Sequence, residues 1–342
     1  MKYCLFKLDF TSPVHFGSGA MAHSLDTGEM TCHADTLFSA LCHTASVLGG
    51  NSKVEWLVRL VQQDALRFSD CMPYQDETLY LPRPCWQPMK QLDLPSGDRK
   101  ILKKAEWIPV DEMESCLSAL RGEGTYNWAN AGNKSKFGTT VEMTKAAVPD
   151  REDAVPYTVG LFQFFENCGL YFILQYEQEN DAAQIEQLVQ ALGYSGIGGK
   201  ISAGYGKFEV AATAYFSCAE DTHDEATAWL YQHFNCANSK HWMLLSAALP
   251  ADAELESVIP SACFQVVRRG GFTHPRGKNA ELLKKQTQYF LSSGSIIAQP
   301  FSGDLFDVGF SPDHPIYRYS KPILLGVNLR SNWDICRNTH LH

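Results

Sequence analysis

Residues 193–208, with the sequence GYSGIGGKISAGYGKF, contain six glycines, two lysines and two serines. A glycine loses more conformational freedom on folding than any other residue, so this density of bare backbone is costly. Something must offset the cost, such as a close approach of the backbone to another group. Because the stretch directly follows a segment with helical periodicity, we expect a glycine-rich loop behind an amphipathic helix.

The length of 342 residues exceeds the usual size of one domain, so two domains are expected. The hydrophobic share of 45% and the charged share of 20% are typical of a globular protein. No apolar run approaches the roughly 20 residues that a membrane helix needs, and the first ten residues do not read as a secretory signal. We therefore expect a cytoplasmic protein.

The eleven cysteines form no C-x-x-C pair. This spacing argues against a zinc ribbon, a thioredoxin-type couple and a disulfide framework. We interpret the cysteines as reduced thiols, mostly buried, and expect neither a metal nor a cofactor.

The charges are unevenly distributed along a chain whose net charge is -9. Residues 83–104 have a net charge of +4, and residues 266–278 carry four basic residues and no acid. Acidic residues gather at 177–186 and 219–226. Each basic patch is either a binding surface for an anion or an ordinary solvated face, and the sequence leaves both readings open.

The first two thirds of the chain alternate between strand and helix patterns. Residues 83–155 lose the hydrophobic period and have the character of an insertion rather than of core. The order of the other elements predicts an α+β fold of the ferredoxin-like plan, four antiparallel strands with two helices on one face. The expected elements are a strand at 3–10, a helix at 36–48 capped by Asp35 and ended by Gly49 and Gly50, a second helix from residue 52, and strands at 77–84, 169–177 and 205–213 around a helix at 181–192.

The remainder of the chain is rich in strand patterns. An acidic segment at 216–240, with a short helix at 226–234, is predicted to link an N-terminal domain of residues 1–215 to a smaller domain of residues 241–342. The predicted strands of the smaller domain are 242–249, 262–269, 285–297 and 321–329.

Four interpretations of the glycine-rich stretch compete. A P-loop is disfavoured because Gly199 stands where the motif needs Lys, and a dinucleotide fingerprint fails because Ile201 replaces its last glycine. The stretch 203–210 only half matches an RNA-recognition motif. Two readings remain: a cradle of backbone N–H groups beside Lys200 and Lys207 for a sugar-phosphate backbone, and a glycine hairpin without a ligand.

Several stretches together resemble a known family. A helix followed by GIGGKISAGYGKF resembles the glycine-rich loop of the RAMP superfamily, the RNA-binding proteins of CRISPR systems. LDFTSPVHFGSG, HADTLFSALCHT, ETLYLPRP, GLYFIL and GSIIAQPFSGDLFDVGFSPDHPIYRY, in this order, resemble the fourth Csm subunit of type III-A effector complexes. The resemblance covers nearly the whole chain and is weakest at 91–150 and 211–240.

The resemblance implies two facing ferredoxin-like domains and a subunit that holds the 5′ repeat-derived tag of the CRISPR RNA (crRNA). Such a subunit caps one end of its complex, between a large polymerase-type subunit and a backbone subunit, and no membrane is involved. An inserted hairpin would reach over the RNA from within 83–155. The bases of that insertion are Arg83, Lys90, Arg99, Lys100, Lys103 and Lys104.

The predicted RNA contacts come from the glycine-rich stretch, the loop after the first strand and a second pair of bases beside glycines. They are His15, Gly17, Ser18, Gly196, Gly198, Gly199, Lys200, Ser202, Gly204, Tyr205, Gly206, Lys207, Arg268 and Arg269. For Arg268 and Arg269, burial in a domain interface is the competing reading.

A catalytic hypothesis rests on His15, His43 and Asp35. Two of these three residues could supply the acid and the base of a metal-independent endoribonuclease that processes CRISPR transcripts. The helix-capping role predicted for Asp35 argues against it. No Ser-His-Asp order, carboxylate pair or metal-ligand spacing is evident elsewhere. We therefore expect a non-catalytic RNA-binding subunit.

Overall fold

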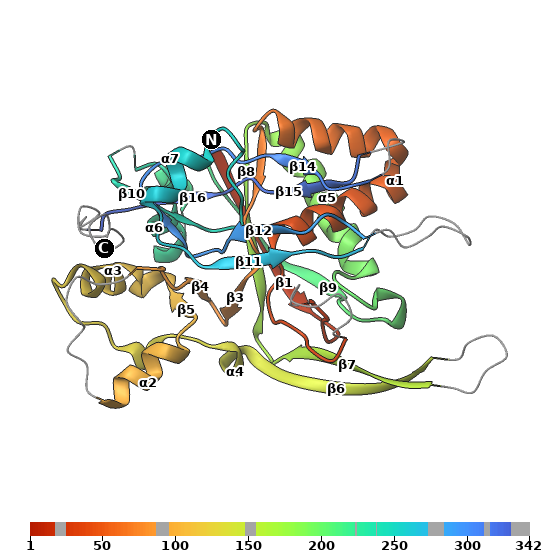
Figure 1. The fold of residues 1–342 in the computed structure, drawn as a ribbon, viewed down its shortest axis with the longest axis horizontal. Coiled ribbons are helices and arrows are strands. Elements are labelled where there is room, and N and C mark those ends of the chain that lie inside the picture. The colour runs from red at the N-terminus through yellow and green to blue at the C-terminus, as the bar shows by residue number, and fades with distance from the viewer. Residues whose placement is uncertain are drawn as a thin grey trace, which may run out of the picture.

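The computed structural model describes residues 1–17, 25–86, 96–147, 155–222, 224–236, 238–272, 284–310 and 315–329. The described parts form antiparallel sheets packed with helices (Figure 1). Ser18 and Lys90 lie outside the described residues. Within these ranges, no helix is both long and apolar enough to cross a membrane.

The largest sheet has the order β5-β4-β3-β8-β1-β9, with β2 also paired to β8. Strand β1 lies between β8 and β9, antiparallel to both, and its Phe6 stacks on Phe172 of β8 with ring centroids 4.9 Å apart. β1 is therefore a buried strand next to the edge strand β9. Its strands are β1 (Lys2–Phe10), β2 (Leu66–Phe68), β3 (Met72–Gln75), β4 (Thr78–Pro82), β5 (Trp107–Pro109), β8 (Cys168–Tyr176) and β9 (Phe208–Phe216).

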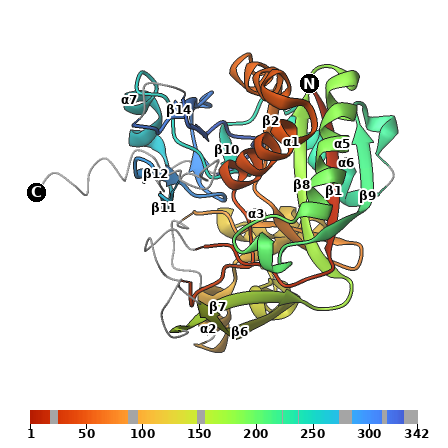
Figure 2. The same cartoon turned by 90° about the vertical axis from the view of Figure 1, so that its right-hand side faces the viewer.

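Two helices, α1 (Ala34–Gln62) and α5 (Glu179–Ser195), lie against one face of this sheet (Figure 2). The connections β1-α1-β2 and β8-α5-β9 follow the β-α-β-β-α-β order that the sequence predicts. The predicted break after residue 48 is confirmed at Gly50, whose φ of 65° interrupts α1 before the helix continues.

The segment predicted to be an insertion contributes to the core, which corrects that part of the prediction. Trp107 and Ile108 of β5 extend the main sheet beside β4, and α3 (Met113–Arg121) buries Met113, Cys116 and Leu117. The signal was missed because one short apolar helix face lies among glycines and lysines. The segment also holds α2 (Ser96–Lys104) and α4 (Lys134–Phe137).

A long two-stranded ribbon projects from the body of the molecule (Figure 1). It consists of β6 (Gly138–Ala147) and β7 (Val155–Phe164), paired antiparallel in a register that runs from Gly138 opposite Phe164 to Ala147 opposite Val155. One face in the middle of the ribbon is apolar and packs on Tyr205 of the glycine-rich loop, with Val159 and Leu161 fully covered.

The last third of the chain forms small sheets of short strands. They are a sheet of order β13-β10-β16 and two paired ribbons, β11-β12 and β14-β15. Each of the four predicted strands overlaps an observed one, but the stretch 285–297 holds two strands, and β14 and β15 were not predicted. Leu230 of α6, within the predicted linker, is fully buried. The elements are α6 (Glu225–Phe234), α7 (Leu255–Val258), β10 (His241–Leu244), β11 (Val266–Arg269), β12 (Gln288–Leu291), β13 (Ile296–Ile297), β14 (Leu305–Asp307), β15 (Tyr317–Tyr319) and β16 (Leu324–Val327).

Tyr319 of β15 joins this last third to strand β2. Its ring is fully buried, with its centroid 5.4 Å from that of Phe38 and 5.8 Å from that of Phe68. Its hydroxyl accepts a hydrogen bond of 2.8 Å from the backbone N–H of Phe68. The tyrosine therefore satisfies a backbone donor at the edge of β2, in the place of another strand.

We expect Tyr319→Phe to lower the free energy of unfolding by about 1–3 kcal/mol, because the buried N–H of Phe68 loses its acceptor. Urea unfolding of the whole chain measures this loss. Tyr317→Phe, in the same strand, is the matched control. A loss no larger than that of the control would show that the hydroxyl of Tyr319 contributes nothing.

Candidate nucleic-acid interface

The glycine-rich loop begins where α5 ends, at Ser195, and leads into β9 through a short 3₁₀ turn at Ile201–Ala203. Its backbone enters the left-handed region at four glycines and at one lysine. The φ angles are 90° at Gly196, 99° at Gly198, 59° at Lys200, 89° at Gly204 and 75° at Gly206. The high density of glycine is therefore required in part by backbone conformation.

Close packing of the loop on itself supplies the rest of the requirement. A Cβ on Gly206 would lie 2.0 Å from the carbonyl oxygen of Ile197, and one on Gly196 would lie 2.6 Å from that of Tyr205. A Cβ on Gly198 would lie 2.6 Å from the carbonyl oxygen of His15. Packing against the protein's own backbone is therefore a sufficient reason for these three glycines, and a close approach of RNA to them stays a prediction. Only Gly204 of the positive-φ glycines in the loop has open space around it.

The loop is also tied to the segment that follows β1. The N–H groups of Gly199 and Gly206 donate to the carbonyls of His15 and Pro13, at 2.8 and 2.9 Å. His15 itself is 6% exposed, and its Nδ1 lies 2.7 Å from the carbonyl oxygen of Gly160 on β7. His15 therefore has a clear structural role, and its contact with RNA stays a prediction.

The side chains of the loop differ in exposure. Lys207 and Ser202 are exposed, Lys200 is half-buried and Tyr205 is buried. The Nζ of Lys200 lies 4.8 Å from the ring centroid of Tyr157 on β7. Both lysines are thus placed where an anion could reach them, as a phosphate contact requires.

A cavity of ≈ 300 Å³ brings separate parts of the chain together. The glycine-rich loop, the segment after β1, the start of α1 and the last third of the chain all contribute to it. Predicted RNA contacts from three of these parts line the same cavity: His15, Gly17, Gly196, Gly198, Gly199 and Arg269. In the sequence these residues lie in three separate stretches, and only the fold brings them to one cavity.

The positive charge of the cavity favours an anion. Among the residues that the structure describes, its lining includes the cations Arg269, Arg318 and Lys285 and a single carboxylate, that of Asp35. Burial, and next the charge of Arg318, lower the pKa of Lys285. A bound phosphate would relieve this crowding of positive charge.

Asp35 and Arg269 form a buried ion pair across the cavity wall. Nη2 of Arg269 donates to Oδ1 of Asp35 at 2.7 Å, and Nε donates to Oδ2 at 3.0 Å. Burial alone would raise the pKa of Asp35, but Arg269 overrides burial and the pKa is lowered. Arg318 lies 3.9 Å from the same carboxylate and donates to the backbone carbonyls of Arg269 and Gln286. The guanidinium of Arg269, a predicted RNA contact, is therefore already engaged within the protein.

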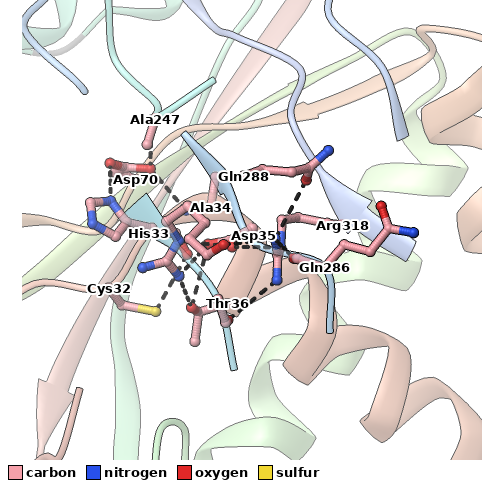
Figure 3. A network of polar contacts seen from close by, with 12 residues as sticks. Cys32, His33, Ala34, Asp35, Thr36, Asp70, Ala247, Gln286, Gln288 and Arg318 are labelled. Carbon is pink, nitrogen blue, oxygen red and sulfur yellow. Dashed lines mark hydrogen bonds and ion pairs between the residues drawn. The ribbon is translucent and has the colours of Figure 1, made fainter. Parts of the chain in front are cut away.

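The predicted capping role of Asp35 is wrong. Helix α1 begins at Ala34, and Asp35 lies in its first turn. The first N–H is capped from another part of the chain, because Oδ1 of Asp70 accepts from Ala34 N at 2.8 Å and from Ala247 N at 3.0 Å (Figure 3). Oδ2 of Asp70 lies 2.8 Å from Nδ1 of His33. Because Asp70 caps the helix, the carboxylate of Asp35 is available to pair with Arg269.

The basic residues predicted elsewhere do not converge on this cavity. Arg268 is half-buried on β11, directly opposite Tyr289. Arg83 donates to the carbonyl of Leu102 at 2.9 Å. Lys100, Lys103 and Lys104 are exposed on α2.

The three residues of the endoribonuclease hypothesis, His15, His43 and Asp35, all line the cavity, but Asp35 and His15 already contact other groups of the protein. Both oxygens of Asp35 contact Arg269, and Nδ1 of His15 contacts Gly160. In the ranges that the structure describes, no group of three or more His, Cys, Asp or Glu residues could hold a metal ion. The described cysteines are free thiols, either buried or half-buried.

Comparisons with known proteins match both halves of the chain. Residues 7–209 match the model of the RAMP superfamily, and residues 237–327 match that of the CRISPR Csm4 C-terminal domain. The CRISPR system Cms protein Csm4 of Mycobacterium tuberculosis (strain ATCC 25618 / H37Rv) is 31% identical over 325 residues, which cover 94% of this chain and 97% of that protein. The protein of the same name from Streptococcus thermophilus is 28% identical over 337 residues and covers 96% and 100%.

Two solved structures share the fold. One is the Csm3-Csm4 subcomplex of the type III-A CRISPR-Cas interference complex, with a TM-score of 0.61 and 18% identity over 96% of this chain and 100% of that chain. The other is the Csm1-Csm4 cassette in complex with pppApA, with a TM-score of 0.59 and 20% identity over 97% and 100%.

The two glycines of the loop that differ most in surroundings give a direct test of its packing. Gly204→Ala should cost about 1 kcal/mol of unfolding free energy, because only its left-handed backbone is strained. Gly206→Ala should cost about 1–3 kcal/mol more, because its Cβ would overlap Ile197. Urea unfolding of both variants checks this, and equal losses would contradict the loop packing described here.

The ion pair predicts a pH dependence. A lowered pKa means that Asp35 stabilises the fold above its ordinary value of about 4, and that this contribution is lost as the pH falls through the lowered value. Asp35→Asn should therefore cost about 3–5 kcal/mol at pH 7 by leaving Arg269 unpaired.

Urea unfolding from about pH 7 to about pH 3 measures the difference between Asp35→Asn and the wild type, which should narrow below about pH 4. Asp252→Asn removes the same charge from an exposed position and is the control. A difference that stays constant over this range would exclude the ion pair as its source.

Proposed function

The chain belongs to the RAMP superfamily and, within it, to the Csm4 proteins, and from that premise we propose that it is the subunit of a type III-A CRISPR ribonucleoprotein that binds the 5′ repeat-derived tag of the crRNA. The observation that carries the proposal is the cavity between the glycine-rich loop and Arg269. Its walls combine hydroxyl groups such as those of Ser39 and Ser195, glycine backbone and a surplus of cations, and these groups suit a sugar-phosphate backbone.

The same proposal assigns the architecture. We interpret residues 1–215 as a ferredoxin-like domain, 216–240 as a linker and 241–342 as a smaller ferredoxin-like domain. The inserted hairpin is then the β6-β7 ribbon, which begins within the predicted insertion of 83–155 and extends past its end to Phe164. The β-α-β-β-α-β order of the first part supports this division. So do the separate family matches at 7–209 and 237–327.

The proposed partners are the large polymerase-type subunit on one side and a backbone subunit of the RAMP superfamily on the other. Support comes from the solved structures with this fold, which are named as a Csm1-Csm4 cassette and a Csm3-Csm4 subcomplex. A subunit with one partner of each kind caps the complex at the end that holds the tag. Such a particle would act on RNA in the cytoplasm.

The proposed role is non-catalytic. Asp35, the acid of the endoribonuclease hypothesis, is held by Arg269 and keeps a lowered pKa, so its oxygens are committed to a guanidinium. A general base must reach the proton that it removes. The geometry therefore favours holding RNA over cutting it.

The test is the affinity of the chain for a crRNA with an intact tag and for one with a scrambled tag, with and without the large subunit. The isolated chain should bind both weakly, and addition of the large subunit should tighten binding of the intact tag by at least about tenfold, because two proteins then share the cost of ordering the RNA. Gel analysis of the same samples should show uncut RNA.

Tight and equal binding of both RNAs, unchanged by the large subunit, would replace the proposal with a general single-strand binder. RNA cleavage that His15→Ala abolishes would instead establish the endoribonuclease.

A further inference from the structure

Two lysines and two tyrosines meet where the β6-β7 ribbon contacts the glycine-rich loop. The Nζ of Lys145 on β6 lies 5.3 Å from the ring centroid of Tyr205 in the loop. The Nζ of Lys200 in the loop lies 4.8 Å from the ring centroid of Tyr157 on β7. Lys145 and Tyr157 are direct cross-strand partners, so the four side chains form one cluster. We call it the Lys–Tyr cluster.

The tyrosine rings fix the two ammonium groups without neutralising them. A ring attracts a cation through its face, yet it carries no net charge. Lys145 and Lys200 are both half-buried, and within the part of the chain that the structure describes each ammonium group contacts one of these rings rather than a carboxylate. By contrast, Lys2, Lys7 and Lys321 each form an ion pair with an acid. The cluster therefore holds two positive charges that an anion can still neutralise.

The backbone of Lys200 supports a role for its side chain. Its φ of 59° is in the left-handed region, where the loop otherwise uses glycine. A residue with a Cβ costs about 1 kcal/mol or more in this conformation, so glycine would suit the backbone better. The lysine at this position implies that its side chain is needed.

The position of the cluster identifies the anion. Gly199 and Ile201, on either side of Lys200, line the cavity assigned to the RNA. Tyr205 is 7% exposed and packs on Val159 and Leu161, so the middle of the ribbon and the loop are one packed unit. RNA that leaves the cavity beside Lys200 would next reach Lys145 on the ribbon.

We propose that Lys145 and Lys200 together bind a single backbone phosphate of the RNA, and that Tyr157 and Tyr205 position the two ammonium groups for it. This inference rests on the proposed function and adds to it a phosphate site formed jointly by the ribbon and the loop. A phosphodiester has one negative charge and several acceptor oxygens, so it can accept from two ammonium groups at once.

The test measures RNA affinity against salt concentration for the chain bound to the large subunit. Lys145→Gln and Lys200→Gln should each weaken binding about tenfold, as expected for loss of a hydrogen bond to a charged group. The double variant should lower the salt slope by about 0.7, the value for one phosphate on a single strand. A loss of about 1.4 would mean two separate phosphates and would overturn the shared site.

Three further variants separate the charge from the packing. Lys145→Arg keeps both the charge and the cation–π contact, and it should bind within about threefold of the wild type. Tyr205→Phe keeps the ring and should leave the affinity unchanged. Lys53→Gln is the matched control, because Lys53 also lies over an aromatic ring, at 4.2 Å from that of Trp56, but on the distant half of α1.

The outcomes distinguish this inference from the proposed function. If the wild type does not prefer the intact tag, the proposed function fails. If it does, and both glutamine variants bind like Lys53→Gln with an unchanged salt slope, the phosphate site alone is wrong. Weaker assembly with the large subunit at an unchanged salt slope would assign the lysines to an acidic protein surface, which also overturns the phosphate site.

Discussion

The ion pair between Asp35 and Arg269 is the constraint on which the cavity depends. It joins the first turn of α1 to β11, two elements separated by more than two hundred residues of sequence. Both side chains are nearly buried, so the loss of either charge would leave the other buried and unpaired. Such a pair is expensive to break, so it fixes how the last third of the chain meets the first. Asp70 makes this possible by capping α1 from outside the helix. Two carboxylates therefore shape this wall of the cavity: Asp70 caps α1, and Asp35 pairs with Arg269.

The glycine-rich loop forms the opposite wall, and its composition follows from its own folding. Left-handed backbone and contacts with the segment after β1 explain most of its glycines. The loop is therefore rigid before any ligand arrives. A preformed site loses less conformational freedom on binding than a flexible one, and this suits the proposed role of holding one short stretch of RNA in a fixed place.

Local patterns predicted the local structure well. The alternation at 3–10, the helical spacing before Gly193 and the apolar run at 169–177 each correspond to an observed strand or helix. The predictions failed where the structure depends on contacts between residues that are far apart in the sequence. The spacing predicts a cap at Asp35 that Asp70 supplies instead. It does not reveal that Arg269 pairs with Asp35, and the RNA contact of Arg269 stays a prediction. No spacing in one sequence reveals such partners. Lys145 was not singled out, because its register opposite Tyr157 exists only once the ribbon has formed.

The central claim is that the 5′ tag lies in the cavity between the glycine-rich loop and β11. A crRNA with a photoactivatable nucleotide at one tag position at a time, assembled into the complete complex and irradiated, would test it directly by mass spectrometry of the cross-linked peptides. We expect tag positions to cross-link to residues 196–207 and to residues 266–272, and spacer positions to cross-link elsewhere. Tag cross-links that reach neither segment, in a complex that retains its crRNA, would contradict the account.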